Sequence, residues 1–235
     1  MRHEDFLKRL TLEYPQTAAA NDVEHFIVPT LIAPQVIDFP RSWLKSAENL
    51  TSLFHNGVRE SEFSLRKIAP LAPPVSKPKT SSVLMSYDYH VDFSKDPSGQ
   101  LKLIEINTNA SMSLLLDVLN CELNVDRCLK DEFMDDFETA LGEPLKGKRA
   151  VIVDEKPETQ KLFIEFLMYK ELFESRGAHC RIVDRKDLEF KNGELRLPRE
   201  PGFGAIDLVY NRLTDFYFEQ PESLALRQAM EQGKV

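Results

Sequence analysis

The chain has 235 residues, of which 42% are hydrophobic and 29% are charged, a composition that is ordinary for a soluble globular protein of one or two domains. Its formal net charge of −8 disfavours nucleic acid as a partner. No apolar run is long enough to span a bilayer, and the charged opening MRHEDFLKRL lacks the apolar core of an export signal, so we expect a cytoplasmic protein without a membrane partner.

The first helices are predicted from apolar residues at helical spacing. Residues 3–13 form a short amphipathic pattern, and a second helix is expected to begin at Pro40 and to stop at Gly57. Between them, FIVPTLIAPQVIDFP is apolar but broken by prolines, which predicts an extended segment. The proline-rich stretch IAPLAPPVSKPKT, which follows the second helix, predicts a linker.

A β-hairpin is the clearest element of the first half of the chain. Residues 82–93 and 101–108 are rich in β-branched and aromatic side chains, and the turn sequence SKDPSGQ joins them. One long helix is then expected from about Ser113 to Leu141, ended by GEPLKG. We place a domain boundary near residue 145, so that residues 1–145 form a helical part that contains the hairpin.

Residues 146–235 have the pattern of an α/β domain. The run RAVIVDE is a continuous apolar strand of the kind that is buried in a parallel sheet. A helix over 158–176, closed by Gly177, leads to a second strand, HCRIVD. A hairpin on Asn192-Gly193, a strand IDLVYNR and a helix ESLALRQAME complete the pattern. Strands that alternate with helices predict a mixed α/β (α+β) fold with an at least partly parallel sheet.

The stretch LIEINTN, at 103–109, places polar side chains in an apolar strand. Strand side chains alternate, so Glu105 and Asn107 are expected on one face, and Ile104 and Ile106 on the other, buried face. A carboxylate and an amide oxygen at neighbouring positions of one face suit a hard cation such as Mg²⁺. On spacing alone, a surface glutamate and a strand-end asparagine without such a function are the commoner explanation.

The motif IEINT, entered from an apolar strand and followed by the small polar loop NAS, resembles the metal-binding strand of ATP-grasp ligases. Its position ahead of the α/β region resembles the order in circularly permuted members of that superfamily, the eukaryotic-type glutathione synthetases and the glutathionylspermidine-synthase-like proteins. The resemblance to these enzymes covers most of residues 27–219. It includes the segments SYDYHVDF, KRAVIVDE, DRKDLEFKNGELRL and IDLVYNRLTDFY. It implies an ATP-grasp-like part followed by a Rossmann-like substrate domain, with Mg²⁺ and ATP as cofactors.

The resemblance assigns roles to residues of the hairpin. It implies that Glu105 and Asn107 are ligands of the Mg²⁺ that bridges the nucleotide phosphates. Asp88, on the partner strand, matches an aspartate of the family's site and is a candidate catalytic residue; the alternative is a surface strand residue. The family usually has an arginine just before this aspartate, whereas this chain has Ser86-Tyr87 there.

Further roles fall on the α/β part and on the loop after the hairpin. Arg212, at the end of IDLVYNR, matches a catalytic arginine that binds the substrate carboxylate, for which a guanidinium fork is suited. The alternative for Arg212 is a salt bridge to Asp215 or Glu219. Ser111 and Ser113 lie near the small-residue loop that contacts substrate in glutathione synthetases.

Other patterns have open interpretations. Asp154 and Glu155 close the strand RAVIVDE, where they either line a ligand site at the sheet edge or cap a helix. The motif D-x-H-x-D in the first hairpin strand is also found in metallohydrolases, but no second histidine motif accompanies it. Residues 216–218, Phe-Tyr-Phe, are interpreted as core. The cysteines lack CxxC spacing and are expected to be reduced thiols: Cys121, Cys128 and Cys180.

The resemblance implies a carboxylate–amine ligase, in which ATP phosphorylates a substrate carboxylate and an amine attacks the acyl phosphate. Since the chain ends at QAMEQGKV and has no glycine-rich phosphate loop, we expect the N-terminal portion of a longer ligase, inactive by itself. The alternative is a non-catalytic peptide- or amino-acid-binding protein on a ligase-derived scaffold. The expected substrate is a small or peptide-like molecule with a carboxylate, joined to an amine acceptor. The sequence leaves open whether that acceptor is glutathione-like, a polyamine or an amino acid, and whether the protein is a homodimer.

Overall fold

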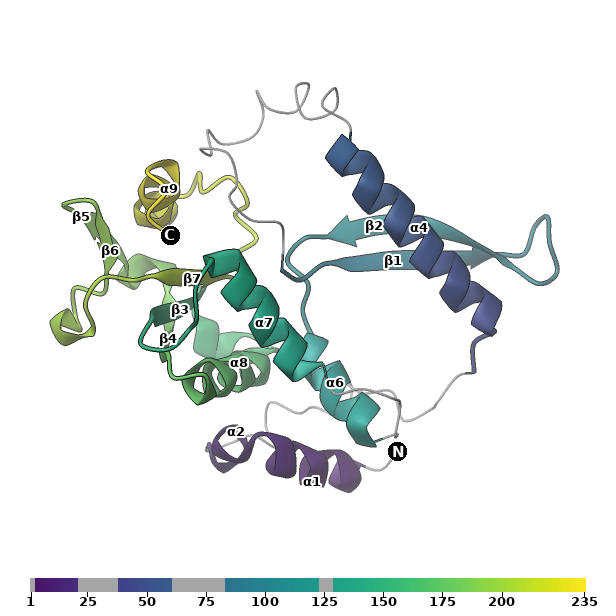
Figure 1. Ribbon diagram of the computed structural model, residues 1–235, viewed down its shortest axis with the longest axis horizontal. Helices are drawn as coiled ribbons and strands as arrows, with labels where there is room; N and C mark the ends of the chain where they lie inside the picture. Colours follow the sequence, from purple (N-terminus) through teal and green to yellow (C-terminus); the bar gives the residue numbers. More distant parts are fainter. Residues whose placement is uncertain (1–2, 21–37, 61–82, 123–128) are drawn as a thin grey trace. The chain divides into compact units, whose positions relative to one another are not determined.

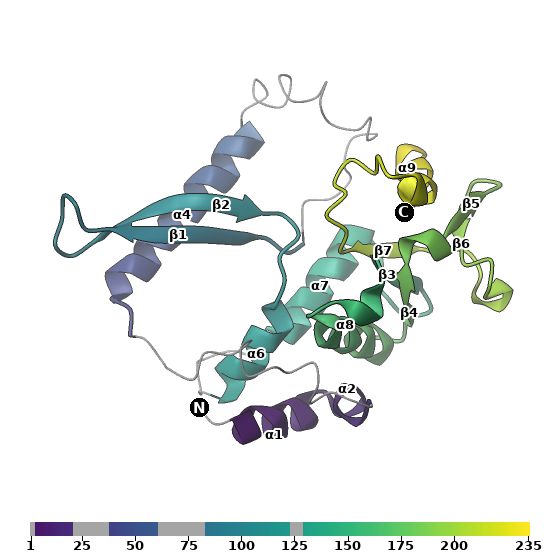
Figure 2. The ribbon, with the colours of Figure 1, turned by 180° about the vertical axis from the view of Figure 1, so that it is seen from behind.

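The computed structural model describes residues 3–20, 38–60, 83–122 and 129–235 (Figures 1 and 2). Helices and small sheets are both present, which confirms the mixed α/β class. The chain divides into two compact units. Unit 1 comprises Met1–Pro34, Val75–Val83 and Ser111–Val235. Unit 2 comprises Gln35–Pro74 and Leu84–Ala110.

These units divide the chain differently from the boundary expected near residue 145, because residues 111–145 group with the α/β part. The expected linker after the second helix, and nearly all of the extended segment before Pro40, lie outside the described residues. No helix in the part of the chain that the structure describes is both long and apolar enough to cross a membrane.

Unit 2 is a helix laid across one face of a hairpin (Figures 1 and 2). Its elements are α4 (Arg41–Glu60), β1 (Ser86–Asp92) and β2 (Gln100–Asn107), and the strands pair antiparallel as predicted. Trp43 Nε1 donates to the carbonyl of Ser98 at 2.9 Å, which ties α4 to the hairpin turn. The expected stop at Gly57 is wrong, since α4 continues to Glu60. A single glycine inside a helix costs only about 1 kcal/mol, too little to end it.

The hairpin contains a β-bulge at Ile104. Asp88 is paired with Glu105, whereas the next residue of β1, Tyr89, is paired with Leu103, so Ile104 is the extra residue of β2. The side chain of Ile104 is 61% exposed. The expectation that Ile104 and Ile106 share a buried face is therefore wrong for Ile104, because the bulge interrupts the strict alternation on which it depends.

Unit 1 is built around a three-stranded parallel sheet. Its strands are β3 (Arg149–Asp154), β4 (His179–Asp184) and β7 (Leu208–Asn211), in the order β4-β3-β7. Residues 150–153 of the central strand are fully buried, as the continuous apolar run predicts. A small hairpin, β5 (Glu189–Lys191) and β6 (Glu194–Arg196), turns at Asn192 (φ 55°) and Gly193 (φ 77°), the left-handed conformations that this pair of residues favours.

The helix α8 (Phe163–Ser175) is the centre of the packing in unit 1. It contacts β3 and β4 on one side, and α2 (Pro15–Ala19), α6 (Ser113–Glu122) and α7 (Lys130–Leu141) on the other. The other face of the sheet is covered by β5–β6 and α9 (Leu224–Glu231), over a core that includes Val151, Val153, Leu195 and Leu226. The helix α1 (His3–Glu13) lies against α2 and α6.

The single helix expected from Ser113 to Leu141 is wrong, since α6 and α7 are separate helices. A buried carboxylate from elsewhere in the fold caps the start of each of α2, α6 and α7. Glu171 accepts from the backbone N–H of Thr17, Glu165 from that of Leu114, and Asp117 from that of Leu129. The residues directly before α2 and α7 make no side-chain cap, so these remote carboxylates satisfy N–H groups that a helix start leaves unpaired.

The cysteines differ from expectation at one position. Cys121, in α6, is disulfide-bonded, so the prediction of a reduced thiol is wrong there. Cys180, in β4, is a free and buried thiol, and burial raises its pKa to about 12. Cys128 lies outside the described residues.

Candidate functional site

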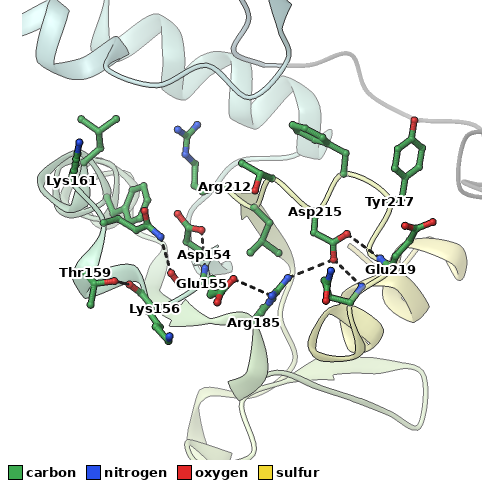
Figure 3. Close-up of a pocket in the computed structure, with 17 residues that line it drawn as sticks. Asp154, Glu155, Lys156, Thr159, Lys161, Arg185, Arg212, Asp215, Tyr217 and Glu219 are labelled. Carbon is green, nitrogen blue, oxygen red and sulfur yellow. Dashed lines mark hydrogen bonds and ion pairs between the residues drawn. The ribbon is translucent and has the colours of Figure 1, made fainter.

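The carboxyl edge of the parallel sheet in unit 1 is hollowed. The central strand β3 has β4 on one side and β7 on the other, so the loops that follow β3 and β7 diverge and leave a crevice, as parallel sheets do at such a point. A cavity of about 1290 Å³ lies there (Figure 3). Asp154, Glu155 and Arg212, which the sequence places at strand ends, all line this cavity.

Arg212, directly after β7, is held at the cavity by residues of β3 and β7. Its backbone N–H donates to the carbonyl of Val153, and its Nη1 donates to the hydroxyl of Tyr210 at 3.2 Å. The guanidinium also lies over the Tyr210 ring, 5.4 Å from the ring centre. Burial raises the pKa of the Asp154 carboxyl, although the charge of Arg212 opposes that shift. The floor of the cavity therefore presents a cation beside a partly buried carboxylate.

Arg185 forms an ion-pair network that the sequence did not indicate. Only 9% of this residue is exposed, and its guanidinium lies 3.1 Å from Glu155 and 3.5 Å from Asp215. It also donates to the hydroxyl of Ser223. A salt bridge to Asp215 was one alternative for Arg212; the structure pairs Asp215 with Arg185. Arg185, which itself lines the cavity, thus joins the loops after β3 and β7 (Figure 3).

The loop after β7 forms one rim of the cavity. Asp215 accepts from the backbone N–H groups of Glu219 and Gln220, which fixes the loop as a tight turn. Phe216 and Tyr217 are 59% and 48% exposed and line the cavity, so their interpretation as core is wrong. Phe218 is buried, and the core interpretation is confirmed for that residue alone.

The opposite rim comes from the loop after β3 and the start of α8. It contributes Lys156, Thr159 and Lys161 to the lining. In Figure 3, Lys161 and Tyr217 stand on opposite sides of Arg212. The cavity is therefore walled by lysines on one side and by aromatic rings on the other, with Arg212 between them.

The hairpin of unit 2 brings the other expected site residues together. Asp88 is opposite Glu105 in the strand pairing, and Asn107 Nδ2 lies 3.0 Å from Glu105 Oε1 and 3.5 Å from Asp88 Oδ2. All of these side chains are exposed. Asp92, in the D-x-H-x-D motif, is ion-paired with Lys102 instead.

The donor set of Asp88, Glu105 and Asn107 fits a hard cation. An electropositive amide NH₂ lies against both carboxylates, and a half-turn of the Asn107 amide would present its oxygen in the same place. Mg²⁺ would take its remaining ligands from water or phosphate. Among the described residues, no group of three or more His, Cys, Asp and Glu side chains could hold a metal ion, and the hairpin set contains only two carboxylates.

No model of a known protein family matches the chain, and a search of curated proteins also finds no match. Two sets of residues carry the chemistry from which a function can be inferred, the hairpin set in unit 2 and the cavity in unit 1.

The expected substrate loop begins α6. Ser113 is the first residue of that helix, and Ser111 is exposed just before it. The loop is fixed by Glu165, which accepts from the backbone N–H of Met112 at 2.7 Å. Burial raises the pKa of Glu165, and its bonds to the loop and the charge of Arg212 oppose that rise. The start of α6 is thus held by a glutamate of α8 that the sequence did not indicate.

Proposed function

We propose that the chain belongs to an ATP-dependent carboxylate–amine ligase of the circularly permuted ATP-grasp type, with unit 1 as its Rossmann-like substrate-binding part. The observation that carries the proposal is the arrangement of Asp88, Glu105 and Asn107. Glu105 and Asn107 are the residues of the E-x-N motif, Asp88 is the aspartate that the resemblance matches on the partner strand, and their oxygen-bearing side chains meet on one hairpin. Such a set of oxygens is what a hard cation requires.

The residues have separable roles in this proposal. Mg²⁺ and ATP would be held by Asp88, Glu105 and Asn107. ATP would supply the phosphoryl group that converts the substrate carboxylate to an acyl phosphate, and Mg²⁺ would neutralise the charge of that group. Arg212 binds a carboxylate of a peptide-like substrate through its planar fork. The aromatic rim formed by Phe216 and Tyr217 covers the apolar part of that substrate.

The metal role is tested with Mn²⁺ as a substitute for Mg²⁺. We expect Glu105→Gln to weaken Mn²⁺ binding by at least about tenfold, as loss of a metal-site carboxylate does. Asp92→Asn, which removes a carboxylate from the same hairpin outside the set, is the matched control and leaves the affinity unchanged. Equal affinities of the wild type and Glu105→Gln would show that the assigned ligands are wrong.

The reaction is tested by amine-dependent release of ADP in the presence of a peptide carboxylate, in the complete gene product. We expect the release to need both the carboxylate and the amine, and to be lost in Glu105→Gln. ATP hydrolysis that does not respond to either substrate contradicts a ligase.

A non-catalytic binding protein is the second candidate, and one observation favours it. The cavity of unit 1 has its own cations, carboxylates and aromatic rim, so it can recognise a zwitterionic ligand without the hairpin. Binding of a peptide carboxylate that Arg212→Gln abolishes, without ADP formation under any condition, supports this alternative over the enzyme.

A further inference from the structure

Arg185 directly follows β4, and its guanidinium is shared between the two loops that wall the cavity (Figure 3). Its Nη2 donates to Glu155 Oε2 at 3.1 Å, in the loop after β3. Its Nη1 lies 3.5 Å from Asp215 Oδ2, in the loop after β7. The side chain of Arg185 is 10% exposed, whereas that of Glu155 is 56% exposed. The two arms of one buried guanidinium are thus divided between the two rims of the cavity.

Asp215 is the centre of the turn that carries the aromatic rim. Its Oδ1 accepts from the N–H of Glu219 at 3.0 Å, and its Oδ2 accepts from that of Gln220 at 3.2 Å. The same Oδ2 accepts from the hydroxyl of Ser223 at 2.7 Å, and that hydroxyl accepts from Arg185 Nη1 at 3.2 Å. Arg185 therefore reaches this turn by two routes, one directly to the carboxylate and one through a serine that is fully buried.

The loop after β3 has a second attachment to the end of β4. The backbone N–H of Lys156 donates to Asp184 Oδ2 at 3.1 Å, beside the contact between Glu155 and Arg185. Lys156 has a φ of 45°, a left-handed conformation that lysine rarely adopts and that this bond supports. The loop after β3 is thus a fixed reference, and Arg185 holds the turn of the aromatic rim against it.

We propose that Arg185 is a positioning residue that gives the cavity its specificity, because it fixes the aromatic rim relative to the loop after β3. A lysine could not take its place, since a single ammonium lacks the two arms that reach both carboxylates. Arg185 acts through Asp215 and leaves the ligand carboxylate to Arg212. Its effect on ligand choice rests on the proposed function, whereas its hold on the rim does not.

The first test follows the turn itself by hydrogen exchange, without any ligand. In Arg185→Gln the carboxylate of Asp215 loses its cation, so the turn that it fixes is held less firmly. We expect the amide hydrogens of Glu219 and Gln220 to exchange about fivefold faster than in the wild type, as for loss of a charge-assisted contact, while that of Ile152 in β3 keeps its rate. Unchanged exchange at Glu219 and Gln220 overturns the proposal.

Arg176→Gln is the matched control for this measurement. Arg176 also pairs with more than one carboxylate, those of Asp131 and Asp135 in α7, but it does not line the cavity. The control should leave the exchange of Glu219 and Gln220 at the wild-type rate. If Arg176→Gln speeds it as much as Arg185→Gln does, the effect is a general loss of ion pairs and the proposal is wrong.

A second variant releases the turn from the opposite rim and leaves Arg185 in place. Glu155→Ala removes one of the two carboxylates that the guanidinium joins, at an exposed position where truncation is tolerated. We expect the turn to exchange about twofold faster, whereas Glu158→Ala, an exposed change in the same loop outside the cavity lining, has no effect. Equal exchange in these two variants overturns the proposal, and this pair decides the matter if Arg185→Gln does not fold.

The second test compares two carboxylate probes, propionate and 3-phenylpropionate, in titrations followed by nuclear magnetic resonance. Both offer a carboxylate to Arg212, but only 3-phenylpropionate has a ring for the aromatic rim to cover. We expect it to bind the wild type about tenfold more tightly than propionate, and Arg185→Gln to reduce that ratio to about twofold with propionate affinity retained. A ratio that stays at tenfold overturns the proposal. An equal loss of both affinities does so too, because it indicates a direct bond of Arg185 to the ligand carboxylate or damage to the fold.

Failure of the proposed function gives a different result. If neither probe binds the wild type, or if Arg212→Gln leaves both affinities unchanged, the cavity is not the carboxylate site and the role of Arg185 in ligand choice is refuted with it. The exchange of Glu219 and Gln220 is measured without ligand, and so it decides independently whether Arg185 holds the rim.

Discussion

Asn107 donates its side-chain amide to Glu105, with 3.0 Å between Nδ2 and Oε1, and Asp88 lies at 3.5 Å on the partner strand. The amide thus separates two carboxylates that would otherwise repel each other. This arrangement has a direct consequence for divalent cations, since the affinity of an oxygen site rises with the number of charged ligands that it offers.

Asn107→Asp should bind divalent cations more tightly than the wild type. The change replaces a neutral ligand with a third carboxylate, so we expect Mn²⁺ affinity to rise about tenfold, together with lower stability of the metal-free protein from repulsion among the carboxylates. Calorimetric titration with Mn²⁺ measures the first effect and thermal unfolding the second. Ser46→Asp adds the same charge to the exposed part of α4 and should change neither. Unaltered Mn²⁺ affinity in Asn107→Asp would mean that the amide is not a ligand.

Gly99→Ala should destabilise unit 2. Gly99 has a φ of 81°, and a Cβ there would lie 2.4 Å from Val91 Cγ1 and 3.0 Å from the Trp43 ring. We expect a loss of about 2–4 kcal/mol in the free energy of unfolding, from strain and from overpacking. Trp43, the single tryptophan of the chain, reports the transition by fluorescence.

Gly142→Ala is the control for that measurement. Gly142 has a φ of 79°, but a Cβ at this position would meet no atom of the described residues within 4 Å. The substitution therefore isolates the conformational cost alone, about 1–2 kcal/mol, which far-ultraviolet circular dichroism follows during unfolding. If the two substitutions cost the same, the close approach at Gly99 does not limit stability.

Glu171→Ala should destabilise unit 1 through the loss of a cap. The carboxylate accepts from the part-buried N–H of Gln16 and from the buried N–H and hydroxyl of Thr17. We expect a loss of about 2–4 kcal/mol in the free energy of unfolding by urea, because buried donors are left unpaired. Thr17→Ala removes only the hydroxyl bond and should cost about 1 kcal/mol. If the double mutant loses as much free energy of unfolding as the two single mutants combined, the bond between Glu171 and the Thr17 hydroxyl is contradicted.

Asp215 should contribute stability that depends on acid pH. Burial raises the pKa of this carboxyl, but the Ser223 hydroxyl, the N–H groups of Glu219 and Gln220, and Arg185 outweigh burial and hold the pKa below its usual range. A lowered pKa means that the ionised form stabilises the fold at neutral pH, and that this contribution is lost as the pH falls from about 4 through the folded-state pKa.

The stability difference between the wild type and Asp215→Asn measures this contribution. We expect about 1–3 kcal/mol at pH 7, as for hydrogen bonds to a charged group, and a progressively smaller difference as the pH falls below about 4. Asp136→Asn, at an exposed position of α7, should show no such trend. A difference that grows on acidification would reverse the sign assigned to Asp215.

The strands of unit 1 and both hairpins could be predicted because their signals are local. A fully apolar run such as that of β3 has few alternatives to a buried strand, and Asn192-Gly193 supports a specific turn by itself. The separation of α6 from α7 could not be predicted in the same way. The start of α7 is capped by Asp117 of the preceding helix, which accepts from the N–H of Leu129. The spacing of apolar residues does not indicate that bond.

The candidate site was predictable in part for the same reason. Asp154, Glu155 and Arg212 follow strands, and strand ends of a parallel sheet gather at one edge. Arg185 is also at a strand end, but its burial depends on Glu155 and Asp215 folding over it. The exposure of Phe216 and Tyr217 depends on the turn that Asp215 fixes, whereas composition favours a core position for aromatic rings.

The extra residue at Ile104 changes which positions of β2 are shielded from solvent, from odd-numbered to even-numbered residues. Up to Leu103 the odd-numbered positions of β2 are the more shielded ones; after Ile104 the even-numbered Ile106 is, and Glu105 and Asn107 lie open. Because Ile104 is the extra residue, its removal leaves Leu103 shielded and Glu105 and Asn107 open in a regular alternation, so both Ile104→Ala and deletion of residue 104 should leave Mn²⁺ affinity intact. A three-nucleotide deletion at this codon would then shorten and straighten the strand, while the ligand side chains keep their face.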